Sequence, residues 1–381
     1  MGLSFLEGNE AIAWGAMAGG CNFFAGYPIT PATTIFNSML KLLPPAGGVC
    51  LQGEDEIASI GFCLGASMAG KKTMTATSGP GISLYSEQIS FAIGSEIPIV
   101  IVNVQRLGPS TGSATKGADG DIQFMRWGNS GGQPVIVLAP VDVQDCYTLT
   151  IHAFNLAEQY RCPVFIAANK EISMTRESVD LTVLDIPKIK NRLRASENEP
   201  FLPFKVSGKV SGKNQVPEFL PIGSKTLVRQ TSSTHGPDSY ITVDPEIIAC
   251  TQQRLYNKIC SDIDKFTFYE ADMDLDAEIL VICYGVTARA AKTAAENIRK
   301  QGKPVSLLIL KTLWPVPEKL ILKHVQGIKY VIVPEMNLGQ YVREIRQILQ
   351  GIKIEFLGQM NGNLIRPAQI EDQIKEFICN E

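Results

Sequence analysis

The chain has 381 residues, with 35 basic and 38 acidic side chains that give a formal net charge of −3 at neutral pH. This length predicts two or three domains with substantial hydrophobic cores, and the scattered Lys and Arg residues indicate no nucleic-acid partner. No apolar segment reaches the roughly 20 residues that a bilayer-spanning helix needs, so we expect no membrane span.

The first predicted elements lead into a proline-containing loop. The first seven residues carry no basic group and end in Glu7, so we expect no secretory signal and a cytoplasmic protein. Residues 8–20 are predicted to form a helix capped by Asn9. Residues 21–25 form an apolar run that predicts a short buried strand.

The loop at residues 26–33 is predicted to be a stiff strand-to-helix turn. Pro28 and Pro31 restrict its backbone, and Tyr27 and Thr30 supply hydroxyl groups. Open α/β sheets bind ligands at the carboxyl ends of their strands, so this loop is a candidate wall of a ligand site.

Strands and helices then alternate to about residue 175. The sequence predicts further strands at residues 48–52, 72–77, 97–104, 135–139 and 163–168. It predicts helices at residues 34–42, 53–69, 82–93 and 142–160. The alternation predicts an α/β fold built on a doubly wound parallel sheet, and the continuous apolar run at 97–104 indicates that both faces of the sheet are covered.

The remaining chain divides into a connector and a second region of regular structure. The periodicity fades after residue 175, and residues 188–237 are rich in Lys, Ser, Gly, Pro and Asn. Alternating strands and helices return near residue 277. We therefore expect a first domain at residues 1–175, an extended connector at 176–275 that wraps this domain or a partner, and a smaller α/β domain at 276–381.

Three consecutive acids, Glu54 to Glu56, open the predicted helix at 53–69. Acids in a first helical turn stabilise the helix dipole, so a purely structural interpretation is available. Glu56, however, is followed by a segment of small and apolar residues that places it on the packed side of the helix. An acid directed into an apolar crevice at the end of a strand is a candidate for chemistry.

Two more loops follow predicted strands. Ser78 and Gly79 open a glycine turn that is either only a tight turn or an anion-binding loop, and it is neither a Walker loop nor a dinucleotide fingerprint. Arg106 precedes a polar loop that contains Thr115 and Lys116. Its guanidinium suits a carboxylate bound through two hydrogen bonds, although a surface arginine is the plain alternative.

Five motifs occur in register along almost the whole chain: Y-P-I-T-P at 27–31, E-D-E at 54–56, T-S-G-P-G at 77–81, Q-R-L-G-P-S-T-G at 105–112 and L-K-T-L-W-P at 310–315. Together they resemble the alpha subunits of 2-oxoacid:ferredoxin oxidoreductases, above all the 2-oxoglutarate branch. The resemblance implies that the first domain is a thiamine diphosphate pyrimidine-binding domain. It implies that the last domain is like the transketolase carboxy-terminal domain.

The resemblance also implies roles for single residues. Glu56 is the implied catalytic residue, which hydrogen-bonds the aminopyrimidine ring of the cofactor. The predicted substrate-binding residues, with the arginine on the substrate carboxylate, are Thr30, Arg106, Thr115, Tyr27 and Lys116. The predicted cofactor-binding residues are Glu56, Ser78, Gly79 and Pro28.

Two parts of such an enzyme are missing from the sequence. The G-D-G motif and Asn pair of the diphosphate and Mg²⁺ site are replaced by Asp119-Gly120-Asp121 alone. The nine cysteines include no C-x-x-C pair and look like buried free thiols, so we expect no metal ligands and no iron–sulfur cluster on this chain. The resemblance implies a beta subunit that supplies both, with gamma and ferredoxin-like delta subunits as further partners.

The implied reaction is thiamine-dependent oxidative decarboxylation of 2-oxoglutarate to succinyl-CoA with reduction of ferredoxin, or the reverse carboxylation, in anaerobic metabolism. Residues 113–119 depart from the usual family pattern, so a branched-chain 2-oxoacid such as 2-oxoisovalerate, or pyruvate, stays open as the substrate. An alternative of another class is a non-catalytic assembly subunit. Glu56 and Arg106 argue against that alternative.

Overall fold

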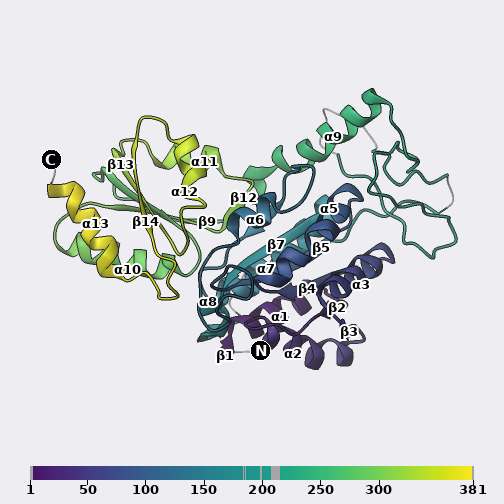
Figure 1. Cartoon of the computed structure of the whole chain (residues 1–381), viewed down its shortest axis with the longest axis horizontal. Helices are drawn as coiled ribbons and strands as arrows, with labels where there is room; N and C mark the ends of the chain where they lie inside the picture. The colour runs from purple at the N-terminus through teal and green to yellow at the C-terminus, as the bar shows by residue number, and fades with distance from the viewer. Residues whose placement is uncertain (1–2, 183, 185, 198–199, 207–214, 380–381) are drawn as a thin grey trace.

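The computed structural model describes residues 3–182, 184, 186–197, 200–206 and 215–379. Two layered α/β regions lie side by side, with the amino terminus on the first and the carboxyl terminus at the far end of the second (Figure 1). Among the described residues, no helix is long and apolar enough to cross a membrane.

The first region is built on a seven-stranded sheet in the order β12-β6-β7-β5-β4-β2-β3. All neighbouring pairs from β6 to β3 are parallel, and β12 adds an antiparallel edge. The strands are β2 (Phe23–Gly26), β3 (Val49–Gln52), β4 (Thr73–Thr77), β5 (Ile99–Gln105), β6 (Ile136–Leu138), β7 (Pro163–Asn169) and β12 (Thr312–Trp314). The predicted parallel α/β sheet is therefore confirmed, whereas β12 was not predicted.

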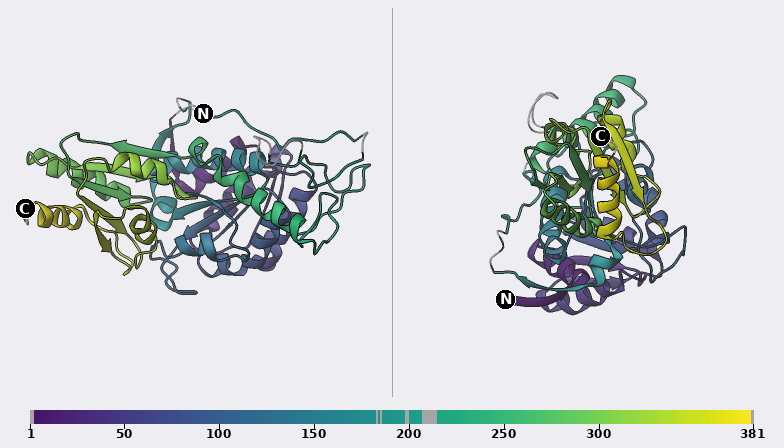
Figure 2. Two further views of the ribbon diagram at one scale, coloured as in Figure 1. Left: turned by 90° about the horizontal axis from the view of Figure 1, so that it is seen from above. Right: turned by 90° about the vertical axis from the view of Figure 1, so that its left-hand side faces the viewer.

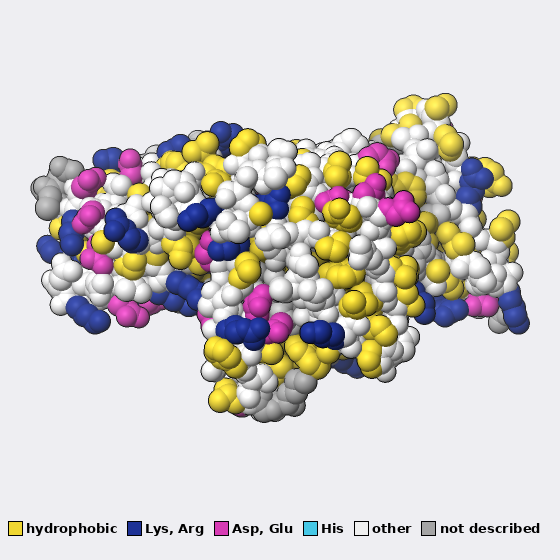
Figure 3. All heavy atoms as spheres, turned by 60° about the horizontal axis from the view of Figure 1, so that its bottom comes forward, with side chains coloured by type: hydrophobic (Ala, Val, Ile, Leu, Met, Phe, Trp, Pro, Cys, Tyr) yellow, Lys and Arg dark blue, Asp and Glu magenta, His cyan; other side chains and the backbone are white. Residues whose placement is uncertain are grey.

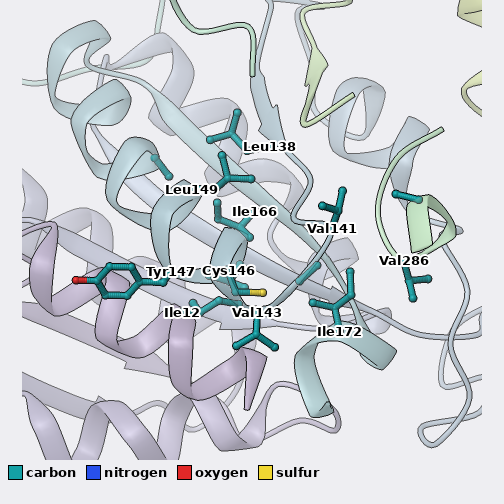
Figure 4. Close-up of a cluster of buried hydrophobic side chains, with 14 of the residues drawn as sticks. Ile12, Leu138, Val141, Val143, Cys146, Tyr147, Leu149, Ile166, Ile172 and Val286 are labelled. Atoms are coloured by element: carbon teal, nitrogen blue, oxygen red, sulfur yellow. The ribbon is translucent and has the colours of Figure 1, made fainter. Parts of the chain in front are cut away.

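Helices cover both faces of this sheet. They are α1 (Gly8–Ala18), α2 (Thr33–Leu42), α3 (Glu56–Met68), α4 (Pro80–Leu84), α5 (Ser86–Gly94), α6 (Ile122–Trp127), α7 (Val143–Tyr160) and α8 (Lys170–Met174). Along β5, Val100 and Val102 belong to one buried apolar cluster, and Ile101 between them belongs to the other. Figure 4 shows part of the first cluster, where Ile12 of α1 and Cys146 of α7 lie close to the sheet.

The second region is a five-stranded sheet in the order β14-β13-β10-β11-β9. Its strands are β9 (Tyr269–Asp272), β10 (Ile279–Cys283), β11 (Ser306–Leu310), β13 (Tyr330–Glu335) and β14 (Lys353–Gly358). Its helices are α10 (Thr287–Lys300), α11 (Glu318–His324), α12 (Val342–Ile348) and α13 (Pro367–Cys379). Val286 packs in the same apolar cluster as Ile172 and Val141 of the first region, so the two regions share a core at their junction (Figure 4).

The range predicted as an extended connector holds regular structure. It contains β8 (Arg176–Asp180), which pairs antiparallel with β1 (Leu3–Glu7), and the long helix α9 (Pro245–Cys260). The described remainder of this range extends away from the second region, and α9 returns toward it (Figures 1 and 2). Residues 183, 185, 198–199 and 207–214 of the range lie outside the description.

The fold also contains two short 3₁₀ helices, η1 (Pro44–Ala46) and η2 (Ile263–Lys265).

Helix α9 was missed because basic residues interrupt its buried stripe. Arg254 and Lys258 alternate there with Leu255 and Ile259. Both basic side chains reach Glu96, which is fully buried: Arg254 Nη2 donates to its carboxylate at 2.6 Å and Lys258 Nζ at 2.8 Å. Burial alone would raise the pKa of Glu96, but the cations outweigh it and hold that pKa well below its usual range.

Candidate functional site at the carboxyl edge of the first sheet

Four neighbouring strands of the first sheet end at one edge, and each is followed by a predicted site segment. The strands are β5, β4, β2 and β3, which pair in parallel in that order. The segments that follow them begin at Arg106, Ser78, Tyr27 and Gly53 respectively. The parallel register therefore brings together motifs that are spread over 80 residues of sequence.

Glu56 is the buried acid of this edge. It is the first residue of α3, whose N-cap Asp55 accepts a hydrogen bond from the backbone nitrogen of Ala58 at 2.7 Å. Glu54 and Asp55 are exposed, whereas Glu56 is buried. Among the described residues, no group donates a hydrogen bond to the Glu56 carboxylate, so this acceptor remains available to a ligand.

Gly81 lets the turn after β4 pack closely against Glu56. A Cβ atom at position 81 would overlap the Thr77 hydroxyl and would lie 2.9 Å from Glu56 Cγ. The T-S-G-P-G turn and the E-D-E segment are therefore in direct contact. Any larger residue at position 81 would push the Glu56 side chain away.

Gly79 and Arg106 form a second contact across the edge. Gly79 has φ +42°, in the left-handed region that favours glycine, and a Cβ atom there would lie 3.2 Å from Arg106 Nε. The neighbouring Ser78 hydroxyl is buried and has no hydrogen-bond partner within the described part of the chain. The turn after β4 thus offers one free polar group and lies directly against the arginine.

Arg106 is held by the opening loop. Its Nη1 donates to the carbonyl oxygen of Thr30 at 2.5 Å, and its buried Nε finds no partner among the described residues. Burial lowers the pKa of the Arg106 guanidinium, and the Asp121 and Glu56 carboxylates partly offset that effect. A fixed guanidinium with a free N–H edge is well suited to a carboxylate ligand.

The opening loop is fastened by Asn9, which is not the helix cap that the sequence predicted. The N-cap of α1 is instead Glu7, whose backbone nitrogen donates to the Glu10 carboxylate at 2.9 Å. The buried Asn9 side chain donates to the Pro31 carbonyl at 2.8 Å and to Thr34 Oγ1 at 2.7 Å. Sequence reasoning missed this role because the partners lie more than 20 residues away.

The remaining predicted residues line the rim of the site. Tyr27 and Thr30 are exposed and Pro28 is half-buried, all on the loop after β2. Thr115 and Lys116 are exposed on the loop that Arg106 begins, and no described contact joins them to Glu56. The structure therefore gathers Glu56, Ser78, Gly79, Arg106 and Thr30 tightly and leaves Thr115 and Lys116 further along the same loop.

The base of that loop is buried at the junction with the second region. Asp119 is fully buried, and its Oδ1 accepts from Asn169 Nδ2. Burial, reinforced by Glu171, Glu335 and Asp121, raises the pKa of Asp119 well above its usual range. Asp119 is thus part of the scaffold beneath the loop.

The hydrogen-bonding groups at this edge are suited to a polar aromatic ring. Glu56 supplies a buried carboxylate acceptor, and Ser78 and Arg106 supply a hydroxyl and a guanidinium N–H that have no partner among the described residues. Gly79 and Gly81 let the turn that carries Ser78 pack closely against Arg106 and Glu56. An aminopyrimidine ring can complement such groups through hydrogen bonds, so the residues fit the pyrimidine half of thiamine diphosphate. Within the described ranges, no cluster of three or more His, Cys, Asp or Glu side chains could hold a metal ion.

Two family comparisons cover most of the chain. Residues 14–248 match the family described as pyruvate flavodoxin/ferredoxin oxidoreductase, thiamine diphosphate-binding. Residues 277–370 match the pyruvate:ferredoxin oxidoreductase core domain II. The first match covers strands β2 to β7 of the first sheet and the edge described above.

Similar proteins extend over nearly the full length. The chain is 42% identical over 372 residues to the 2-oxoglutarate synthase subunit KorA of Methanocaldococcus jannaschii, covering 97% of this chain and 99% of that one. It is 34% identical to the ketoisovalerate oxidoreductase subunit VorB of Methanothermobacter marburgensis, covering 99% and 98% of the two chains.

Solved structures give the same fold. A 2-oxoglutarate:ferredoxin oxidoreductase from Magnetococcus marinus, with 2-oxoglutarate, coenzyme A and succinyl-CoA bound, matches with a TM-score of 0.91 and 33% identity. The alignment covers 98% of this chain and 65% of that chain. A split-gene transketolase matches at a TM-score of 0.51 and 12% identity, which shows a shared fold alone. The chain therefore belongs to the alpha-subunit family of the thiamine-dependent 2-oxoacid:ferredoxin oxidoreductases, on the side of the 2-oxoglutarate synthase KorA subunits.

Proposed function

We propose that this chain is the alpha subunit of a 2-oxoglutarate:ferredoxin oxidoreductase. The complex converts 2-oxoglutarate and coenzyme A to succinyl-CoA and carbon dioxide while it reduces ferredoxin, or it runs the reverse carboxylation. The observation that carries this proposal is Glu56, a buried acid with no hydrogen-bond partner among the described residues, at the edge where four parallel strands end. It lies in a chain that is 42% identical along its length to a KorA subunit.

Glu56 acts on the pyrimidine half of the cofactor. When bound, thiamine diphosphate supplies the carbon nucleophile that attacks the 2-oxo group and accepts the electrons left by decarboxylation. The Glu56 carboxylate holds a proton at a ring nitrogen of the aminopyrimidine, and its burial strengthens that hydrogen bond. Ser78, Gly79 and Pro28 border the same ring.

Arg106 orients the substrate. Its Nη1 is already occupied by the Thr30 carbonyl, which leaves the Nε edge for the substrate carboxylate. Thr30 and Thr115 add hydroxyl donors, and Tyr27 and Lys116 border the substrate from the exposed rim. A fixed cation positions the 2-oxo carbon without having to move during the reaction.

We infer that a second chain completes the site, and the exposed residues at its rim support this inference. Tyr27 is 38% exposed, Leu51 40%, Leu84 47% and Ile57 48%, and all lie on the segments that surround Glu56. Figure 3 shows hydrophobic side chains spread among polar ones over the face of the molecule that it presents. Large exposed apolar groups beside unpaired polar groups are typical of a protein interface.

We assign that second chain to a beta subunit that carries the diphosphate and Mg²⁺ site and an iron–sulfur cluster. Gamma and ferredoxin-like delta subunits complete the complex, which works in the cytoplasm with ferredoxin as its electron acceptor. The chain spans 65% of the Magnetococcus marinus chain, so that relative carries further segments within one polypeptide.

Anaerobic reconstitution tests the proposal. The chain is co-expressed with a beta subunit, supplied with thiamine diphosphate, Mg²⁺ and coenzyme A, and assayed for 2-oxoglutarate-dependent reduction of methyl viologen. We expect turnover from the complex and none from the isolated chain. A complex that contains both subunits and cofactor but turns over no 2-oxoacid would refute the proposal and favour a non-catalytic assembly role.

The alternative substrate 2-oxoisovalerate is supported by the 34% identity of the chain to a ketoisovalerate oxidoreductase subunit. Competition between 2-oxoglutarate, 2-oxoisovalerate and pyruvate in the same assay separates these possibilities. The higher identity to the KorA subunit leads us to expect the largest kcat/KM for 2-oxoglutarate. A larger value for 2-oxoisovalerate would reassign the substrate but leave the reaction type intact.

A further inference from the structure

The loop that carries Arg106, Thr115 and Lys116, here called the 106–121 loop, is fixed at its far end by the second region. Near its start, the backbone nitrogen of Leu107 donates to the Lys116 carbonyl at 2.8 Å, which closes the loop on itself. Toward its end, the backbone nitrogen of Asp119 donates to the Met336 carbonyl at 2.8 Å.

Two side chains of the second region add hydrogen bonds to the same stretch of backbone. Asn337 Nδ2 donates to the Asp119 carbonyl at 3.0 Å, and Gln340 Nε2 donates to the Gly120 carbonyl at 2.6 Å. Together with the bond to Met336, these contacts determine where residues 119 and 120 lie. The second region therefore sets the direction from which the chain returns after Lys116.

Asn337 is itself held rigidly. Its Nδ2 also donates to Glu335 Oε2 at 2.9 Å, and its Oδ1 accepts from the backbone nitrogens of Gly339 at 2.8 Å and Gln340 at 3.0 Å. Glu335 and Asn337 are both buried. A buried, fully connected polar network holds a single geometry, so the end of the 106–121 loop has little freedom to shift.

Lys116 contacts the second region directly. A Cβ atom at Gly362 would lie 2.9 Å from Lys116 Cβ and 3.1 Å from its Cγ and Cδ. Gly362 has φ +76° and lies between β14 and α13. The aliphatic stem of Lys116 therefore rests on a backbone surface that exists only because position 362 has no side chain.

We propose that Gly362 of the second region positions Lys116 toward the substrate. The second region contains none of the predicted site residues, yet through this contact it would affect how tightly the 2-oxoacid binds. The proposal rests on the assignment of Lys116 to the substrate under the proposed function. Gly362 is a positioning residue, because it acts through Lys116 and touches no substrate itself.

The test compares two glycines of the second region with similar positive φ angles in the reconstituted complex. Asn tolerates positive φ better than other residues with a Cβ, so Gly362→Asn adds bulk on Lys116 with little backbone strain. Gly351→Asn is the matched control, because Gly351 has φ +86° in the same region and nothing lies within 4 Å of its Cβ position. Both variants are checked for assembly and for Tm, and Gly362→Ala replaces Gly362→Asn if the latter fails to assemble.

We expect Gly362→Asn to raise KM for 2-oxoglutarate about fivefold or more while kcat stays within about twofold, since displacing a charged partner costs part of a charge-assisted hydrogen bond. KM for coenzyme A should not change, and Gly351→Asn should match the wild type. Equal KM values for both glycine variants would overturn the proposal.

A double-mutant cycle with Lys116→Ala decides whether the effect passes through the lysine. In the Lys116→Ala background, Gly362→Asn should change KM by less than about twofold, because the side chain on which it acts is gone. If the two substitutions change KM for 2-oxoglutarate independently, so that their fold-changes multiply in the double mutant, the proposal is overturned. A Lys116→Ala complex with wild-type KM would also overturn it. Turnover of 2-oxoglutarate by the wild-type complex is measured in parallel. If the proposed function is wrong, the wild-type complex shows no turnover, and this result is distinct from a failure of the Gly362 proposal.

Discussion

Two buried carboxylates of the first region, Glu56 and Glu96, have opposite surroundings. Glu96 is fully paired: Arg254 Nη2 lies 2.6 Å and Lys258 Nζ 2.8 Å from its carboxylate oxygens. Glu56 lies at the edge where four strands end, and within the described residues it has no hydrogen-bonded partner. A buried acid with paired cations holds elements together, whereas a buried acid without a partner is available for a ligand.

The largest effect on catalysis is expected from neutralising Glu56. Glu56→Gln keeps the shape and burial of the side chain but removes its negative charge and its ability to take up and release a proton. We expect kcat of the reconstituted complex to fall by about 10²- to 10⁴-fold, the usual contribution of a positioned acid or base. Glu54→Gln, at an exposed position two residues away, is the matched control and should keep wild-type kcat. A Glu56→Gln complex with normal activity would remove Glu56 from the mechanism.

Neutralising Glu96 should affect stability instead of catalysis. Glu96→Gln leaves Arg254 and Lys258 buried without their counter-charge, which costs about 3–5 kcal/mol in the free energy of unfolding. Denaturant unfolding measures this loss, with Glu87→Gln as the control because Glu87 is exposed on the adjacent helix α5. The folded variant should keep wild-type kcat, and a large drop in kcat at unchanged stability would reverse the roles that we assign.

A smaller effect should follow from Arg106→Lys. Lysine keeps the charge but loses the Nε edge and the geometry that the Thr30 carbonyl fixes. One lost charge-assisted hydrogen bond corresponds to a rise in KM for the 2-oxoacid of about 10- to 100-fold. Arg194→Lys is the control, because Arg194 is exposed in an ion pair with Glu197. An unchanged KM in Arg106→Lys would remove Arg106 from the substrate site.

The smallest expected effect is the acid dependence of stability. The pKa of Glu96 is held below its unfolded value, so its contribution to stability is complete above about pH 4.3 and is lost as the pH falls through the folded pKa. Between about pH 5 and pH 3, Glu96→Gln should therefore show a shallower loss of unfolding free energy than the wild type, by up to about 1.4 kcal/mol per pH unit. Parallel curves for the two proteins would show that the pKa of Glu96 is the same in the folded and unfolded states.

The sequence predicted the first sheet well because its signals are local. Apolar runs such as residues 97–104 and the turns that follow them were sufficient to predict parallel strands with polar loops at their ends. The location of Glu56 was predictable for the same reason, since an acid at the start of an apolar helix is visible in one stretch of chain. The roles of the nine predicted site residues remain predictions until these experiments are done.

The features that the sequence did not predict share a physical cause: each depends on residues far away in the chain. Helix α9 escaped prediction because Arg254 and Lys258 on its buried side find their counter-charge in Glu96, more than 150 residues away. Asn9 was assigned to its own helix because the Pro31 carbonyl that it holds cannot be inferred from neighbouring residues. Strand β12 belongs by sequence to the second region but pairs with β6 of the first sheet.

The parallel strands of the first sheet and the residues that follow them can be predicted from the sequence alone, because hydrophobic periodicity and turn chemistry act over a few residues. Which of those residues contact one another depends on the tertiary fold. Arg106 reaches the Thr30 carbonyl because β5, β4 and β2 are neighbours in one parallel sheet. Lys116 rests on Gly362 because the second region packs against the 106–121 loop, and contacts between chain-distant surfaces arise only when the whole core has formed.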